Sequence, residues 1–326
     1  MQNLHIRQLA VAATLAAAAS VAHAAVTPPF SALYVFGDSL SDSGNNFFSL
    51  GSTFGPNPNS NTFIPGFPYN PSRTYSNGNT WVSTFAAGLG LPAGAVPSVG
   101  GGGNYAYGGA RTSGGGTFPP SLQSQVSTYL TASPVAPANA LYVLAGGGND
   151  ARAVGVAVAG GADLVSTTLA GAAAYAGATL GIVNSLKAAG ATKIVVWNVP
   201  DLGKTPASGA GIGATAFAGS FIAGTFNSVL NTSLTGSGVT VFDIFSLIGG
   251  VVANPAGNGF GNVTQACGFV GNGCSAANAL FWDGIHPTAF AQSFVGNQML
   301  AAVPEPATYL MFAVGVAGLL AWRRRS

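Results

Sequence analysis

The sequence has few charged residues. Asp, Glu, Lys and Arg make up only 6% of the 326 residues, against roughly a quarter in an average soluble protein. Residues 25–303 contain six cations, seven Asp and no Glu. A region of nearly neutral net charge lacks the basic surface that nucleic-acid binding requires. Since 48% of the residues are hydrophobic, intrinsic disorder is excluded as well.

Histidine and cysteine are equally scarce. His286 is the only histidine between residues 25 and 303, and Cys267 and Cys274 are the only cysteines. A metal site built from clustered His and Cys is therefore close to excluded, while an all-oxygen calcium site stays open. The two cysteines lie seven residues apart in a Gly/Asn-rich stretch. In an exported protein this spacing predicts a local disulfide, with two reduced, buried thiols as the alternative.

The N-terminal residues predict a secretory signal peptide. Arg7 precedes an apolar run over residues 9–19, and Ala22-His23-Ala24 fits a small-x-small cleavage site. The alternative is an ordinary Ala-rich helix, but such a helix needs a polar face and this segment has none. We therefore assign residues 1–24 to a signal peptide.

The C-terminal residues have a different targeting pattern. Pro304-Glu305-Pro306 is followed by an apolar stretch of 16 residues, 307–322, and then by Arg323-Arg324-Arg325. This tail resembles the PEP-CTERM sorting signal of Gram-negative bacteria. The resemblance implies export, transient membrane association through the short helix, and removal of residues 304–326 by an exosortase-type protease. It places the protein in the periplasm, on the outer surface or in the extracellular matrix, and anchors it in the inner membrane before processing. A permanent tail anchor is the alternative.

The region between the two targeting segments has the pattern of one α/β domain, residues 25–303. Short apolar runs of the kind found in buried parallel strands occur at 32–36, 141–144, 194–199 and 239–244. Helices are expected between them, at about 80–89, 122–130, 163–190, 214–234 and 287–300, the last starting at Pro287. Alternating strands and helices predict a doubly wound sheet. Long Gly/Pro/Asn-rich loops are expected at 51–75 and 100–116.

A candidate nucleophile follows the first expected strand. The segment Phe-Gly-Asp-Ser-Leu-Ser-Asp-Ser-Gly-Asn places Ser39 at the carboxyl end of that strand, where ligands bind in open α/β sheets. If a helix starts there, its dipole favours negative charge near the Ser39 amide, which can then help to hold an oxyanion. An ordinary turn is the alternative for this segment alone.

A candidate base and its orienting carboxylate lie near the C-terminus. In Asp283-Gly284-Ile285-His286-Pro287 the carboxyl group stands three residues before the imidazole, within reach of its second ring nitrogen. A surface histidine in a turn is the alternative. However, His286 is the only imidazole of the mature protein, so a Ser39 activated by histidine requires this residue.

Two Gly-rich segments supply candidate oxyanion donors. The first is Asn-Tyr-Ala-Tyr-Gly-Gly-Ala at 104–110, and the second is Gly-Gly-Asn-Asp at 147–150, directly after an expected strand. A backbone amide from the first and the side-chain amide of Asn149 are donors of the required kind. Each segment taken alone is also compatible with a simple Gly-rich turn.

The four segments, in the order in which they occur along the chain, resemble the GDSL (SGNH) hydrolase family over residues 30–302. The resemblance implies a flavodoxin-like three-layer α/β/α sandwich with a mainly parallel sheet. It also implies catalysis without a metal or organic cofactor. Its catalytic residues are Ser39, Asp283 and His286, and its oxyanion hole is formed by Ser39, Gly109 and Asn149. The segment at 73–78 before Trp81 is similar to a substrate-side loop of larger members, although Asn79 stands where a basic residue is common.

Together these features predict an exported serine ester hydrolase, of lipase/esterase or phospholipase-like type, that acts through an acyl-enzyme. The expected partners are an ester or lipid substrate, a signal peptidase and the exosortase-type protease. The alternatives are a polysaccharide O-deacetylase with the same triad and a non-enzymatic surface or matrix protein. A glycosidase is disfavoured because no Glu is available for a second carboxylate. The Gly-rich stretch at 209–214 lacks the strand and acidic residue of a dinucleotide site.

Overall fold

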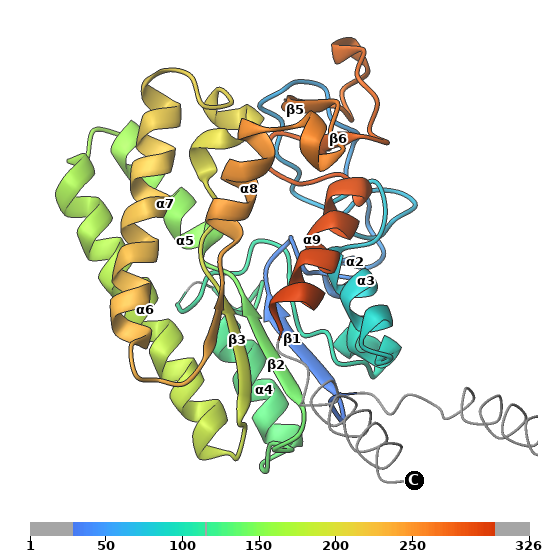
Figure 1. The fold of residues 1–326 in the computed structure, drawn as a ribbon, viewed down its shortest axis with the longest axis vertical. Coiled ribbons are helices and arrows are strands. Elements are labelled where there is room, and N and C mark those ends of the chain that lie inside the picture. The colour runs from blue at the N-terminus through green and yellow to red at the C-terminus, as the bar shows by residue number, and fades with distance from the viewer. Residues whose placement is uncertain (1–28, 115, 304–326) are drawn as a thin grey trace, which may run out of the picture.

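A parallel four-stranded sheet forms the centre of the molecule (Figure 1). The structure is a computed structural model that describes residues 29–114 and 116–303. The strands lie in the order in which they occur in the chain: β1 (Leu33–Gly37), β2 (Leu141–Ala145), β3 (Lys193–Trp197) and β4 (Thr240–Phe242). All five residues of β2 are buried, as expected for a strand covered on both faces. The four predicted strands are confirmed, with ends shifted by one or two residues.

Helices cover both faces of the sheet. One layer contains α4 (Leu122–Ala132), α5 (Gly148–Ala159), α6 (Leu164–Ala188) and α7 (Gly213–Leu234), and the other contains α3 (Trp81–Gly88), α8 (Ile244–Ala253) and α9 (Ala289–Ala302). Because side chains alternate along a strand, Val143 of β2 packs into the second layer, whereas Tyr142 and Leu144 pack into the first. The predicted α/β/α sandwich is thereby confirmed.

The last helix does not start where the sequence pattern placed it. It begins at Ala289, and its N-cap is Thr288, whose Oγ1 accepts a hydrogen bond from the N–H of Ala291 at 3.1 Å. A threonine side chain supplies an acceptor for a free helix N–H, which proline does not. Pro287 instead pairs with Phe281 in an isolated bridge ahead of the helix.

Several elements were not predicted. They are α2 (Asn45–Ser49), α5, α8, and a small parallel sheet of β5 (Asn262–Ala266) and β6 (Ala279–Phe281). The 3₁₀ turns, also unpredicted, are η1 (Pro92–Ala95), η2 (Ser98–Gly100), η3 (Leu202–Lys204), η4 (Pro206–Ser208), η5 (Ala256–Asn258) and η6 (Val270–Asn272). Most are short and Gly-rich, so their apolar periodicity is weak.

Helix α6 is long and apolar enough to cross a membrane by length and composition. In the fold it packs against α4, α5 and α7, and it buries Tyr175, Ile182 and Leu186 in the core. Its apolar character is thus accounted for by its place over the sheet. The expected signal peptide (1–24) and the expected membrane segment (307–322) lie outside the described residues.

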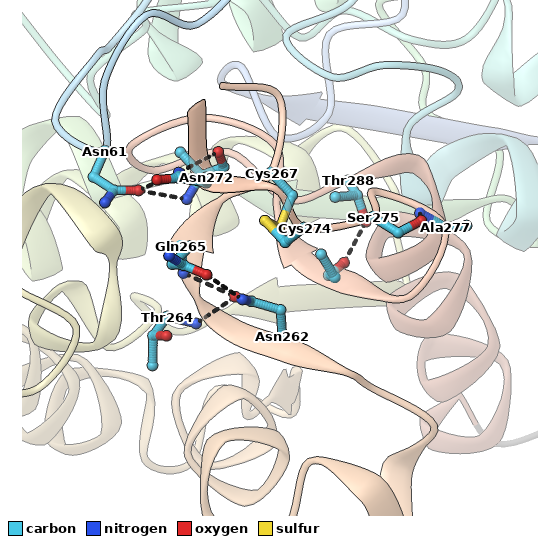
Figure 2. Close-up of a disulfide and its surroundings, with 12 residues drawn as sticks. Asn61, Asn262, Thr264, Gln265, Cys267, Asn272, Cys274, Ser275, Ala277 and Thr288 are labelled. Atoms are coloured by element: carbon cyan, nitrogen blue, oxygen red, sulfur yellow. Dashed lines mark hydrogen bonds between the residues drawn. A yellow bond between two sulfur atoms is a disulfide. The ribbon is translucent and has the colours of Figure 1, made fainter. Parts of the chain in front are cut away.

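The small sheet ties a long loop to the body of the domain (Figure 2). Cys267, directly after β5, is disulfide-bonded to Cys274. Asn272, within the closed loop, donates from Nδ2 to Oδ1 of Asn61 at 2.8 Å. The N–H of Ala266, at the end of β5, donates to the same oxygen at 2.9 Å. Asn61 belongs to the loop predicted at 51–75. The loop is therefore anchored at this point, ahead of the residues that it brings to the carboxyl edge of the main sheet.

Candidate active site

The predicted site residues meet at the carboxyl edge of the parallel sheet. Ser39 lies in the turn after β1, and Asn149 lies in the first turn of α5 after β2. Asp283 and His286 come from the connection between β6 and α9, and Gly109 comes from the loop before α4. Parallel neighbouring strands end at the same edge, which explains why segments more than a hundred residues apart converge here.

The turn that holds Ser39 differs from the expected helix start. The N–H groups of Ser41 and Asp42 both donate to the carbonyl of Asp38 at 3.0 Å, which closes a single tight turn. The helix α2 begins only at Asn45. A helix dipole at Ser39 is therefore absent, and the turn itself directs the Ser39 amide.

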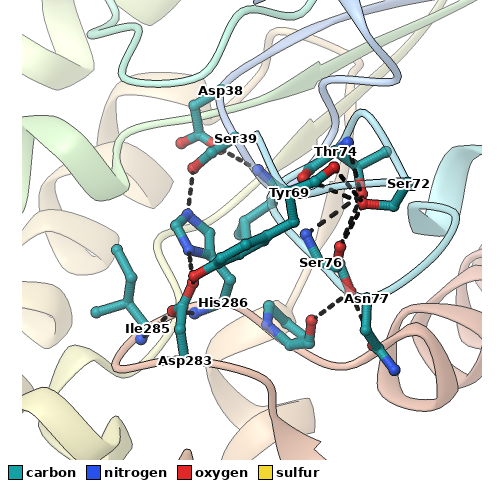
Figure 3. Close-up of polar contacts among 12 residues, drawn as sticks. Asp38, Ser39, Tyr69, Ser72, Thr74, Ser76, Asn77, Asp283, Ile285 and His286 are labelled. Carbon is teal, nitrogen blue, oxygen red and sulfur yellow. Dashed lines mark hydrogen bonds and ion pairs between the residues drawn. The ribbon is translucent and has the colours of Figure 1, made fainter. Parts of the chain in front are cut away.

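A continuous chain of hydrogen bonds joins three of the predicted residues (Figure 3). Ser39 Oγ lies 2.8 Å from Nε2 of His286, and Nδ1 of the same ring lies 2.7 Å from Oδ2 of Asp283. The exposed fraction is 9% for Ser39, 3% for His286 and 0% for Asp283. The arrangement places a hydroxyl, an imidazole and a carboxylate in the order that nucleophilic catalysis by serine requires.

The carboxylate is oriented by its own turn. Oδ1 of Asp283 accepts hydrogen bonds from the N–H groups of Ile285 at 2.8 Å and His286 at 2.7 Å. Gly284 is required inside this turn, because a Cβ at that position would lie 2.7 Å from the carbonyl oxygen of Phe63. The Asp-x-x-His spacing thus allows one carboxylate to bind both the backbone and the ring of the same histidine.

Tyr69 is a site residue that the sequence did not reveal. Its hydroxyl donates to Oδ2 of Asp283 at 2.8 Å, and its ring packs edge-on against Trp282. The side chain is 1% exposed, and burial together with the Asp283 charge raises its pKa above the usual tyrosine range, so it stays a donor. It comes from the loop at 51–75, which has no pattern that distinguishes one tyrosine from another.

The segment at 73–78 divides its contacts between the cavity and α9. Tyr75 lines the cavity beside Ser39. Ser76 Oγ donates to the carbonyl of Pro287 at 2.8 Å, and Oδ1 of Asn77 accepts from the N–H of Ala289 at 2.7 Å. This loop therefore also supports the connection that carries His286.

Three candidate oxyanion donors border one cavity. Ser39, Gly109 and Asn149 all line an open groove of about 340 Å³. Within residues 29–114 and 116–303, the N–H groups of Ser39 and Gly109 donate to no other protein atom. Asn149 donates from Nδ2 to the carbonyl of Ala110 at 2.9 Å and accepts from Arg152 at 3.3 Å, which fixes the orientation of its amide. A second Nδ2 hydrogen remains for a ligand.

A buried carboxylate holds the Gly109 segment in place. Asp42, 0% exposed, accepts from the N–H groups of Gly44, Asn45 and Asn46, and also from Gly108 at 3.0 Å. Burial raises its pKa to about 6, and these N–H groups oppose the shift. One side chain thereby fixes both the turn after β1 and the residue preceding Gly109.

Two further carboxylates flank the site. Asp38 is 4% exposed, and burial raises its pKa to about 6, while the N–H of Leu40 and the neighbouring His286 and Arg152 oppose the shift. Asp150 accepts from the N–H and Oγ1 of Thr112, which anchors the loop before α4. Neither lies in the Ser39–His286–Asp283 chain. No group of three metal-ligating side chains occurs in the part of the protein that the structure describes.

Comparison with known proteins agrees with this architecture. The family model described as GDSL-like Lipase/Acylhydrolase matches residues 33–299, and residues 302–325 match the PEP-CTERM protein-sorting motif, which indicates export. Esterase EstA of Pseudomonas aeruginosa is 30% identical over 91% of this chain and 50% of its own length. This chain thus spans about half the length of that curated relative.

More distant proteins match a similar region. The GDSL esterase/lipase At1g73610 of Arabidopsis thaliana is 28% identical, covering 83% of this chain and 88% of its own length. A crystal structure of a GDSL-like lipase from Parabacteroides merdae covers 85% of this chain and 98% of its own, with 15% identity and a TM-score of 0.46. Since the family model spans most of the sequence, the chain belongs to the GDSL-like lipase/acylhydrolase family.

Proposed function

We propose that this protein is an exported serine hydrolase that cleaves carboxylic esters through an acyl-enzyme. The observation that carries the proposal is the hydrogen-bonded chain from Ser39 through His286 to Asp283 at the wall of an open groove. Membership of the family and the esterase names of its relatives support the same reaction class. A purely structural matrix protein has no need of a buried relay that ends on a serine hydroxyl.

In the proposed mechanism Ser39 Oγ attacks the acyl carbonyl carbon while Nε2 of His286 takes the hydroxyl proton. The imidazolium then returns that proton to the leaving alcohol as the ester C–O bond breaks, which leaves the acyl group on Ser39. Water attacks the acyl-enzyme in the same way and releases the acid. Asp283 holds the ring in the required tautomer and balances its transient charge.

The negative charge that develops on the carbonyl oxygen needs donors that are already in place. We assign the Ser39 and Gly109 amides and the Asn149 side chain to this oxyanion hole, on the ground that all three border the same groove as Ser39. Their orientation is fixed by neighbours rather than by substrate, since Asp42 anchors Gly108 and Arg152 contacts Asn149. Such preorganised donors lower the barrier without reorganisation during the reaction.

Tyr69 is assigned a positioning role in the same relay. Its hydroxyl and the His286 ring both bond to Oδ2 of Asp283, so the two donors share the charge of one carboxylate oxygen. The Tyr69 hydroxyl thereby helps to hold the carboxylate that orients the His286 ring, without touching the reacting atoms.

The site of action is proposed from the sorting motif. We assign the tail at 304–326 to recognition by an exosortase-type protease at the inner membrane, after a signal peptidase has removed residues 1–24. The domain would then act in the periplasm, on the outer surface or in the extracellular matrix.

The first prediction tests the serine mechanism. Ser39→Ala and His286→Ala should each lower kcat for p-nitrophenyl butyrate by at least about 10⁴-fold, and the double variant should be little worse, because the two residues act as one relay. A fluorophosphonate probe should label the wild type but not Ser39→Ala. Ser43→Ala is the matched control, since its Oγ has no partner among the described residues, and it should label normally. Equal labelling of Ser39→Ala and the wild type would refute the assignment.

The second prediction tests the oxyanion hole. Asn149→Ala removes one of three donors, so kcat should fall by about 10²–10³-fold, or roughly 3 kcal/mol, with little change in KM. The control is Asp150→Asn, which removes the neighbouring charge and keeps an acceptor for Thr112. It should retain most of its turnover. An inactive Asp150→Asn beside a fully active Asn149→Ala would show that the roles are misassigned.

The third prediction concerns Tyr69. Tyr69→Phe removes one of the four hydrogen bonds that hold the Asp283 carboxylate, so the His286 ring is held less firmly opposite Ser39. The value of kcat should therefore fall by about tenfold, as expected for a lost hydrogen bond to a buried charge, while KM stays within about twofold of the wild type. Tyr142→Phe, which loses a buried hydroxyl bonded to the carbonyl of Pro137, should leave both constants unchanged. A Tyr69→Phe variant with wild-type kcat would exclude a positioning role.

The fourth prediction tests the tail. In a Gram-negative host that has an exosortase, intact-mass measurement of the purified protein should show a mature chain without the membrane segment. Replacing Pro304-Glu305-Pro306 by three alanines should preserve the segment and keep the protein in the membrane fraction. Recovery of wild-type protein with its tail intact would instead establish a permanent anchor.

A further inference from the structure

A second, larger groove lies between α5 and α7, which run side by side over one face of the sheet (Figure 1). Its volume is about 590 Å³, within the usual range of ligand sites. Residues that line it include Gly155, Val156, Val158, Phe217, Ala218 and Ile222. No residue of the proposed relay borders it directly.

The groove adjoins the proposed catalytic site. Arg152 and Ile285 line it, and both also line the open groove and the small cavity that contain Ser39. His286 follows Ile285 in the chain. Arg152 and Ile285 therefore mark where an alkyl chain attached at Ser39 would pass into the space between the two helices.

The lining of this groove is suited to an apolar ligand. Arg152 is the only charged side chain among the described residues that border it. Val156 and Phe217 are 71% and 67% exposed, so the protein keeps large apolar side chains open to solvent along the rim. Burial of an alkyl chain here is favourable, whereas the hydroxyls of a sugar would lose water and find few hydrogen-bond partners in its place.

Two other spaces border Ser39, and they are the open groove of about 340 Å³ and a small cavity. The small cavity is lined by Trp197, Ile244 and Val295 and has a volume of about 70 Å³. That space accommodates only a few atoms, so an acetyl group fits there but a longer chain does not. Of the two grooves that remain, the one between α5 and α7 is the larger, at about 590 Å³ against about 340 Å³.

We infer that this groove holds the acyl chain of a medium- or long-chain ester, so that the protein acts on lipid esters rather than on acetylated polysaccharides. The inference rests on the proposed ester hydrolysis. It adds a substrate class and a binding surface that the relay itself does not specify.

Gly155 offers a way to fill the groove without disturbing the core. It lies within α5, and a Cβ at this position would meet only Cδ1 of Ile222, at an ordinary 3.9 Å. Gly155→Phe should therefore fold and occupy the groove. Gly155→Ala is the conservative control, and Gly177→Phe on α6 adds the same bulk where a Cβ would meet nothing within 4 Å.

The test compares kcat/KM for p-nitrophenyl decanoate and p-nitrophenyl acetate in the full chain. Gly155→Phe should lower the decanoate-to-acetate ratio by about tenfold, because it removes the burial of several methylene groups. The acetate value itself, Gly155→Ala and Gly177→Phe should stay within about twofold of the wild type. An active Gly155→Phe with an unchanged ratio would overturn the inference and leave the proposed hydrolysis intact.

A binding measurement separates the inference from the reaction. Ser39→Ala titrated with the fluorescent fatty acid cis-parinaric acid should bind it, and adding Gly155→Phe should weaken that binding by about tenfold. Binding that is insensitive to Gly155→Phe would place the chain elsewhere and refute the inference. If the wild type hydrolyses no ester but the groove binds the fatty acid, the proposed function fails while the assignment of the groove stands.

Discussion

The arrangement of the site depends on one fully buried carboxylate. Asp283 has no exposed surface, and a buried charge is tolerated only when it is paired and hydrogen-bonded. Its four donors are the N–H groups of Ile285 and His286, the His286 ring and the Tyr69 hydroxyl. These donors belong to two segments that lie more than 200 residues apart in the chain. Satisfying this carboxylate therefore holds the imidazole within hydrogen-bond distance of Ser39 and also ties the loop at 51–75 to the site.

Asp42 organises the opposite side of the site by the same physical rule. It has no exposed surface, and it gathers backbone N–H groups from the turn after β1 and from Gly108. Gly108 itself has no room for a side chain, because a Cβ there would lie 2.2 Å from the ring of Tyr75. In a domain with so few charges, two buried carboxylates thus position the loops that border Ser39. The sheet brings these loops to one edge, and the two carboxylates fix their conformations.

The sequence predicted those parts of the protein whose signals are local. The four strands of the main sheet appear as continuous apolar runs, and the Asp283-x-x-His286 spacing encodes a contact within one turn. Tyr69 was missed because its partner lies 214 residues away and its own loop has no periodicity. Helix α5 was missed because it starts in a Gly-rich turn. The start of α9 was misplaced at Pro287, because Thr288 is the N-cap and the helix begins only at Ala289. Long-range contacts and weakly patterned helices are therefore the features that required the structure.

The same unpredicted helix links the reaction to the choice of substrate. The first turn of α5 presents Asn149 to the open groove beside Ser39. Its next turn presents Arg152 and Gly155 to the groove shared with α7. Because the proposed oxyanion donor and the apolar surface belong to one rigid helix, the distance between them is constant. Gly155 leaves that surface open, so a longer alkyl chain requires no rearrangement of the protein. On the proposal made above, selectivity for the acyl group is thus a property of how α5 packs on α7, and the proposed relay of Ser39, His286 and Asp283 acts on any ester that the groove aligns.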